Sequence, residues 1–147
     1  IRAIERLQAE YWDALDAKDW EGLRACLVED FVFVNNTTGG RYEGREGMIA
    51  TMQAKFSDGV TSSHHGHHHW IDLIGDGTAV SHWALQDDLY DAGHGGEFVG
   101  RAHYDNAYVK IDGQWRFTKM SLTYLRGEAS IRKSSEDCAN AYKVFMM

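Results

Sequence analysis

Apolar residues in the first third of the chain recur at helical spacing. Over residues 4–16 an apolar side chain follows every three or four positions, at Ile4, Leu7, Tyr11 and Leu15. This spacing places them on one face of an amphipathic helix. The same pattern predicts a short helix over residues 20–27 and a longer helix over 45–56. Between them, residues 31–34 form a short apolar run typical of a strand, and 41–43 predict its returning partner.

From residue 60 onward the pattern is that of long strands. Extended segments over residues 62–74, 78–90, 98–111 and 114–125 are separated by turns rich in Gly and Asp. Asp112-Gly113 is a strong signal for a two-residue hairpin turn. Helices followed by a meander of antiparallel strands predict an α+β fold, with the helices packed on one face of a strongly curved sheet. Such a helix-lined cone encloses a pocket, which is a natural ligand site.

The length of 147 residues fits one domain. We expect it to occupy residues 1–126, with residues 127–147 as its C-terminal tail or packing arm. Lys and Arg total 15 against 22 Asp and Glu, and the net charge of −7 disfavours binding to nucleic acid or to an anionic membrane. No apolar run approaches the roughly 20 residues of a membrane span. With two cysteines and no signal-peptide pattern, we expect a reducing, cytoplasmic location.

Five short motifs along the chain carry a family resemblance. They are LDAKDWEGLR at 15–24, YEGRE at 42–46, SSHH at 62–65, IDLIGDGTA at 71–79 and KIDGQWRF at 110–117. In this order and spacing they resemble the SnoaL-like, scytalone dehydratase-like branch of the nuclear transport factor 2-like superfamily. The resemblance implies a cystatin-like cone with a mixed or antiparallel sheet, a small-molecule substrate, no cofactor and no metal. It also implies a homo-oligomer, either a trimer or a dimer.

The resemblance assigns Asp16 and His64 as a catalytic acid–base pair. A carboxylate bonded to an imidazole fixes the tautomer of the ring and favours its protonated form. His64 would take a proton from a carbon next to a carbonyl and return it to a leaving hydroxyl. The alternative is a surface aspartate beside Asp13 and Asp19, together with an exposed strand histidine.

Several further residues are expected to bind the substrate. Asn106 matches a ligand-facing asparagine of the resembled family, and strand alternation puts Tyr104 and Tyr108 on the same face. Such hydroxyls could stabilise an enolate oxygen. The alternative is a satisfied buried amide between ordinary strand tyrosines.

The second catalytic histidine of scytalone dehydratase has no counterpart here. Asp88 stands near its position, and His82 shares a face of the same expected strand. The two tyrosines that hold the reacting water in that enzyme are replaced by Leu15 and Asn35. Tyr11 and Tyr42 are their candidate substitutes in space.

Eight histidines are present, and five of them lie between residues 64 and 69. On a regular strand His68 shares a face with His64 and could line the pocket. His65, His67 and His69 share the other face, where we expect structural or interfacial roles rather than a metal site. With Trp83 they are candidates for the interface of the homo-oligomer.

These observations favour a cofactor-free dehydratase acting on a small cyclic or polyketide-like hydroxy-carbonyl compound. An isomerase or polyketide cyclase would use the same base without a leaving group. A non-catalytic small-molecule-binding protein would use the pocket alone. Fold does not decide between these functions, because one scaffold hosts many activities.

Overall fold

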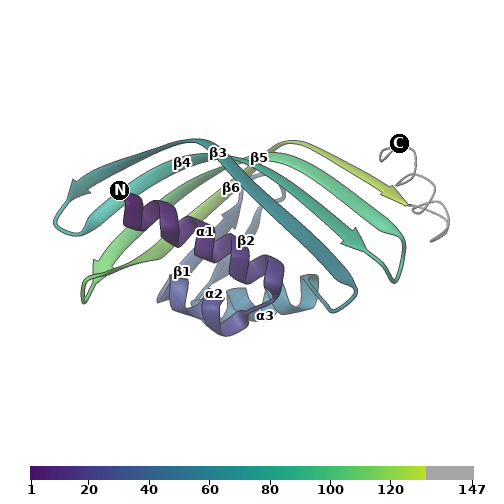
Figure 1. Cartoon of the computed structure of the whole chain (residues 1–147), viewed down its shortest axis with the longest axis horizontal. Helices are drawn as coiled ribbons and strands as arrows, with labels where there is room; N and C mark the ends of the chain where they lie inside the picture. Colours follow the sequence, from purple (N-terminus) through teal and green to yellow (C-terminus); the bar gives the residue numbers. More distant parts are fainter. Residues whose placement is uncertain (132–147) are drawn as a thin grey trace.

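Three helices and one six-stranded sheet make up the part of the chain that the computed structural model describes, residues 1–131. The helices are α1 (Arg2–Ala17), α2 (Trp20–Cys26) and α3 (Arg45–Lys55). The strands are β1 (Leu27–Asn35), β2 (Gly40–Glu43), β3 (Val60–Gly75), β4 (Thr78–Asp91), β5 (Gly96–Ile111) and β6 (Gln114–Ile131). The four long strands arch over α1, with α2 and α3 below it (Figure 1).

The sheet has the strand order β2-β1-β6-β5-β4-β3. β1 and β6 are parallel, and every other neighbouring pair is antiparallel. The sheet is therefore mixed and strongly bent, but it stays open because β2 and β3 are its two edges. The predicted α+β cone is confirmed, with the helices on the concave face of the sheet.

The core lies between α1 and the concave face of the sheet. Strand alternation points Trp83 and Leu85 of β4 inward, where both are buried. Trp12 of α1 packs edge-on against Trp83, with ring centroids 5.5 Å apart. Trp83 is thus a core residue, and its expected role at a subunit interface is wrong. The homo-oligomer itself stays a prediction.

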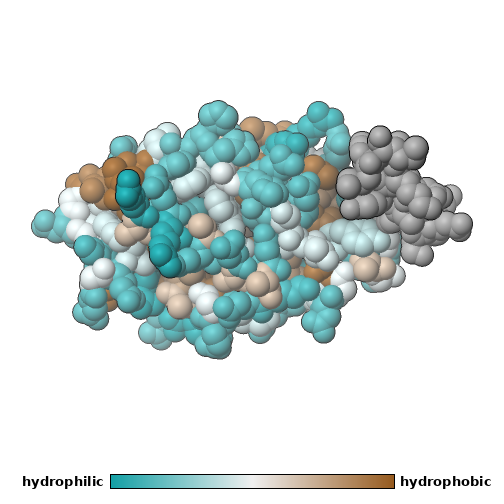
Figure 2. Space-filling model, viewed as in Figure 1, coloured by the Kyte–Doolittle hydropathy of each residue, from teal (hydrophilic) through white to brown (hydrophobic). Residues whose placement is uncertain are grey.

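The outer surface carries a few exposed apolar side chains. Trp70, Leu73 and Ile74 of β3 are each at least half exposed, at 50%, 58% and 64%. On the face drawn in Figure 2, hydrophobic areas are separate and lie within a largely hydrophilic surface. None of the described helices combines the length and the hydropathy that crossing a membrane requires.

The strands are longer at their ends than the sequence pattern predicts. β6 continues to Ile131, so residues 127–131 of the expected C-terminal arm are part of the sheet. Residues 132–147 lie outside the described part. β3 also carries a bulge between His67 and Trp70, where His68 adopts a left-handed φ of 49°.

Candidate active site

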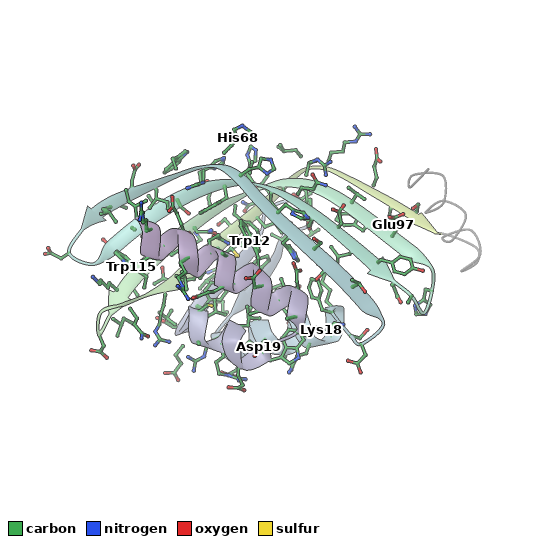
Figure 3. All side chains as sticks on the ribbon, viewed as in Figure 1. Trp12, Lys18, Asp19, His68, Glu97 and Trp115 are labelled. Carbon is green, nitrogen blue, oxygen red and sulfur yellow. The ribbon has the colours of Figure 1, made fainter. Side chains whose placement is uncertain are left out.

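Asp16 lies in the last turn of α1, one turn after the buried Trp12. The helix ends directly afterwards because Lys18 adopts a left-handed conformation, with φ 56°. The side chain of Asp19 then caps α2 by accepting a hydrogen bond from the backbone N–H of Gly22 at 2.9 Å. Figure 3 shows Lys18 and Asp19 at this corner. The end of α1 is thereby fixed where it meets β3.

Asp16 and His64 are in direct contact. Nδ1 of His64 and Oδ1 of Asp16 are 2.6 Å apart. Oδ1 also accepts a hydrogen bond from the Ser62 hydroxyl at 2.7 Å, and Oδ2 accepts one from the backbone N–H of His64 at 2.9 Å. The His64 side chain is only 4% exposed and that of Asp16 is 25% exposed. The contact thus lies at the edge of the protein interior.

The electrostatics of this pair favour an ionised aspartate. Burial opposes ionisation of Asp16, but the hydrogen bond and charge of His64 and the hydrogen bonds from Ser62 and the His64 backbone outweigh it, so its pKa lies below the ordinary value. An ionised carboxylate can only accept hydrogen bonds, which assigns the proton of the neutral imidazole to Nδ1. Nε2 then carries the lone pair, and it has no partner within residues 1–131. A base of this form can remove a proton.

The lowered pKa of Asp16 predicts an acid-dependent stability difference. At pH 7 we expect Asp16→Asn to reduce the free energy of unfolding by about 1.5–3 kcal/mol, because bonds to a charged acceptor are lost. A depressed pKa means that the contribution is complete above the ordinary value of about 3.9 and is lost as pH falls through the folded value. Urea unfolding at pH 7 and pH 3 should show the difference shrinking in acid. Asp13→Asn, an exposed change on the same helix, should stay within about 0.5 kcal/mol of the wild type.

A cavity of about 80 Å³ opens beside His64. Its walls come from α1, α3 and all six strands of the described sheet. The lining residues are Tyr11, Leu15, Phe33, Asn35, Thr38, Tyr42, Thr51, Met52, Lys55, Phe56, His64, Asp87, Tyr104, Leu122 and Tyr124. The Phe56 ring lies 6.1 Å from the His64 ring, measured between centroids. An imidazole, one carboxyl group, four phenols and apolar walls therefore meet in one small space.

A larger, open hollow of about 690 Å³ lies elsewhere, between α1, α2 and the β5–β6 turn. Acidic side chains such as Glu10 and Asp13 line it, but no histidine does. Cys26 also lines it, and burial raises the pKa of this thiol to about 12, so it is not a nucleophile near neutral pH. This hollow has no acid–base pair, so the smaller cavity is the candidate site.

A sequence model of the SnoaL-like domain matches residues 1–121. The chain belongs to the SnoaL-like family. Among solved structures it is similar to a provisionally assigned scytalone dehydratase from Novosphingobium aromaticivorans, with a TM-score of 0.81 and 24% identity over 90% of this chain and 89% of that chain. It is also similar to a hexachlorocyclohexane dehydrochlorinase, LinA type 2, with a TM-score of 0.78 and 17% identity over 88% and 87% of the two chains.

A third similar structure is a protein of unknown function from Mycobacterium tuberculosis. Its TM-score is 0.73, with 26% identity over 84% of this chain and 70% of that chain. The first two likenesses show the shared fold, and the predicted SnoaL-like, nuclear transport factor 2-like assignment is confirmed. They do not transfer a substrate to this SnoaL-like chain.

Two of the predicted substrate-binding residues line the cavity of this SnoaL-like domain. Tyr11 and Tyr104 are both buried, and burial raises the pKa of each phenol, so both stay protonated near neutral pH. Their hydroxyls enter none of the hydrogen bonds within residues 1–131. They are free to donate to a bound molecule. Leu15 and Asn35, which stand in place of the two water-holding tyrosines of scytalone dehydratase, also line the cavity. So does Tyr42, which with Tyr11 was the predicted substitute for them.

Asn106 and Tyr108 point inward as predicted, but they do not line the cavity. Nδ2 of Asn106 donates to Oε1 of Gln8 at 2.9 Å, and the hydroxyls of Tyr108 and Ser81 are 2.7 Å apart. Gln8 comes from α1 and is fully buried, so the helix covers this part of the sheet. The expectation that Asn106 and Tyr108 hold the substrate is therefore not supported by their positions.

His82, Asp88 and His68 lie away from the cavity. His82 and Asp88 alternate with the buried residues of β4 and so face the convex side, where His82 Nδ1 is 2.7 Å from Oδ1 of Asp105. His68 also projects from the convex side, because the bulge in β3 breaks the alternation (Figure 3). The same bulge turns His69 inward, where it stacks on Trp83 with centroids 4.0 Å apart. The prediction that His82, Asp88 and His68 line the pocket is therefore wrong.

Asp87 and Tyr124 are among the cavity residues that were not anticipated. Asp87 continues the inward alternation of Trp83 and Leu85, and this signal was available in the sequence. The family match pointed one residue further, to Asp88. Tyr124 likewise continues the inward series of Met120 and Leu122 in β6.

Proposed function

We propose that this SnoaL-like protein is a cofactor-free dehydratase that acts on a small hydroxy-carbonyl compound. The observation that carries the proposal is the 2.6 Å contact between Asp16 and His64 beside a cavity. Asp16 orients the imidazole through Nδ1, while Nε2 remains available as the base. The membership of the chain in a family whose solved relatives include enzymes of elimination supports the same reaction type.

In the proposed reaction, Nε2 of His64 removes a proton from the carbon next to the substrate carbonyl. The electron pair moves into an enolate, whose oxygen accepts hydrogen bonds from the neutral phenols Tyr11 and Tyr104. The enolate then re-forms the carbonyl and expels the β-hydroxyl. The imidazolium returns its proton to this hydroxyl, which leaves as water, and His64 is neutral again.

The size of the cavity narrows the proposed substrate. Its volume of about 80 Å³ is well below the roughly 150 Å³ of a cavity that accepts benzene. A single ring therefore does not fit entirely within it. A compound with one ring or a short chain, part of which extends through the mouth, suits the site better than a fused polyketide. Lys55 and Thr38, both exposed, line that mouth.

The proposal is tested with 3-hydroxycyclohexanone as a single-ring probe. We expect the protein to convert it to cyclohexenone, seen as the loss of one water by mass spectrometry and as the ultraviolet absorption of the conjugated product. Cyclohexanone, which has no leaving group, should exchange its α-protons for deuterium in D₂O when the protein is present.

The alternatives give different results in the same experiment. An isomerase or cyclase would leave the product mass unchanged, and a binding protein would bind probes without exchange or turnover. If the protein gave no elimination and no proton exchange above the protein-free rate, across a series of small β-hydroxy ketones, that result would contradict the proposal.

A further inference from the structure

A second buried carboxylate lies beside His64 and has no part in the acid–base pair. Asp87 of β4 is the cross-strand partner of His64 of β3. Directly opposed residues on one face of an antiparallel pair have neighbouring side chains. Asp87 is 3% exposed and lines the same cavity as His64. A group bound to Asp87 would therefore lie close to the proposed base.

The two oxygens of Asp87 differ in what they contact. Oδ2 accepts a hydrogen bond from the Tyr124 hydroxyl at 2.5 Å. Oδ1 is fully buried and has no hydrogen-bond partner within residues 1–131. A buried carboxylate oxygen without a partner is costly, so a carboxylate that served only to hold Tyr124 would be expected to have both oxygens satisfied. The unpartnered oxygen points to a ligand that supplies a donor.

The neighbouring strand leaves room for this carboxylate. Gly100 of β5 pairs with Asp87, and a Cβ at Gly100 would lie 2.0 Å from Oδ1 of Asp87 and 2.6 Å from the Tyr124 ring. Any side chain at position 100 would displace the carboxylate or the ring. The arrangement of Asp87 and Tyr124 thus depends on the glycine opposite them.

Tyr124 holds Asp87 without competing for its free oxygen. Burial, together with the hydrogen bond and charge of Asp87, raises the pKa of Tyr124, so the phenol remains a donor near neutral pH. Its single proton is used at Oδ2. Oδ1 remains an unsatisfied acceptor on a side chain that lines the cavity.

We propose that Oδ1 of Asp87 accepts a hydrogen bond from a hydroxyl group of the substrate and so selects hydroxylated compounds. The inference rests on the proposed function in using the same site, and it names the group that this site recognises. Because Asp87 and His64 are neighbours, the bound hydroxyl would lie next to the carbon that loses its proton. Asp87 would thus be the residue that recognises the hydroxyl of a hydroxy-carbonyl compound.

Binding of phenol and fluorobenzene tests this inference without any turnover. The two rings have nearly the same shape, but only phenol carries a donor. Measured by ligand-observed NMR titration of the full chain, wild-type protein should bind phenol about 10- to 100-fold more tightly, the range expected for a hydrogen bond to a charged acceptor. Asp87→Leu should reduce this preference to below about twofold while fluorobenzene still binds. The conservative Asp87→Asn should also reduce it, since Tyr124 then takes the only carbonyl oxygen.

The control is His64→Gln, which replaces the imidazole, another possible acceptor for the phenol hydroxyl, by an amide. This variant should keep the preference for phenol. Absence of the preference in wild-type protein, its persistence in both Asp87 variants, or its loss in His64→Gln would each overturn the inference. Selective phenol binding by a protein with no exchange or elimination would contradict the proposed function and leave the role of Asp87 intact.

Discussion

Replacing His64 by glutamine should lower kcat/KM for elimination by about 10²- to 10⁴-fold, the usual contribution of one general acid–base group. The glutamine amide can still donate a hydrogen bond to Asp16, as Nδ1 does now at 2.6 Å, but it cannot accept a proton from carbon. Asp16 also keeps its bond from the Ser62 hydroxyl. We therefore expect a large loss of kcat/KM with only a small loss of thermal stability. Steady-state kinetics and thermal unfolding of the same variant would measure the two effects.

His65→Gln is the matched control for this change. His65 is the next residue of β3, it is exposed, and its Nε2 is 2.8 Å from the Ser63 hydroxyl rather than near Asp16. We expect its kcat/KM to stay within about twofold of the wild type. If His64→Gln retained activity within a few-fold, the imidazole would not be the base. Equal losses in both variants would indicate damage to the strand rather than removal of the base.

The fold and the main contact of the site were predictable from the sequence. Period-two and helical spacing identified the elements, and the motifs around Asp16 and His64 indicated that two segments 48 residues apart meet. Periodicity also carries the signal for Asp87, since Trp83, Leu85 and Asp87 alternate with outward-facing residues. The family match overrode this signal and favoured Asp88, because an ungapped match can be off by one residue, which reverses the face.

Other features could not be obtained from the pattern. His68 has a left-handed φ of 49°, which is uncommon for a residue with a side chain, and nothing in a run of histidines indicates that the alternation breaks there. Asn106 and Tyr108 face inward as the alternation predicts, but Gln8 of α1 covers them. Which inward positions stay open to a ligand depends on how the helix packs, and that is a tertiary property.

Gly66→Ala should be among the most destabilising single changes in this SnoaL-like domain. A Cβ at Gly66 would lie 1.9 Å from Cη2 and 2.3 Å from Cζ3 of the Trp12 indole. The indole cannot easily move, because it packs against Trp83 and Tyr104 with ring centroids 5.5 Å and 6.4 Å away. Overpacking of a tight core costs about 1–3 kcal/mol, and this contact is at the severe end. Urea unfolding would measure the loss.

Gly96→Ala is the control, because Gly96 is also in a strand and a Cβ there would meet nothing within 4 Å. A smaller residue at position 12 provides a rescue. In the Gly66→Ala background, Trp12→Leu should cost far less than it does alone, and the double-mutant cycle would report the contact between the two positions. Additive effects, or equal stability of the Gly66 and Gly96 variants, would contradict this packing.

Gly66→Ala should also lower activity, and the geometry explains why. Trp12 and Asp16 are one turn apart on α1, and Gly66 and His64 are two residues apart on β3. An added methyl group between Trp12 and Gly66 therefore separates helix and strand beside the 2.6 Å contact on which the proposed chemistry depends. Trp12→Leu should restore activity together with stability in the double variant. Recovery of stability without activity would mean that the indole itself, rather than the close approach of α1 to β3, positions the acid–base pair.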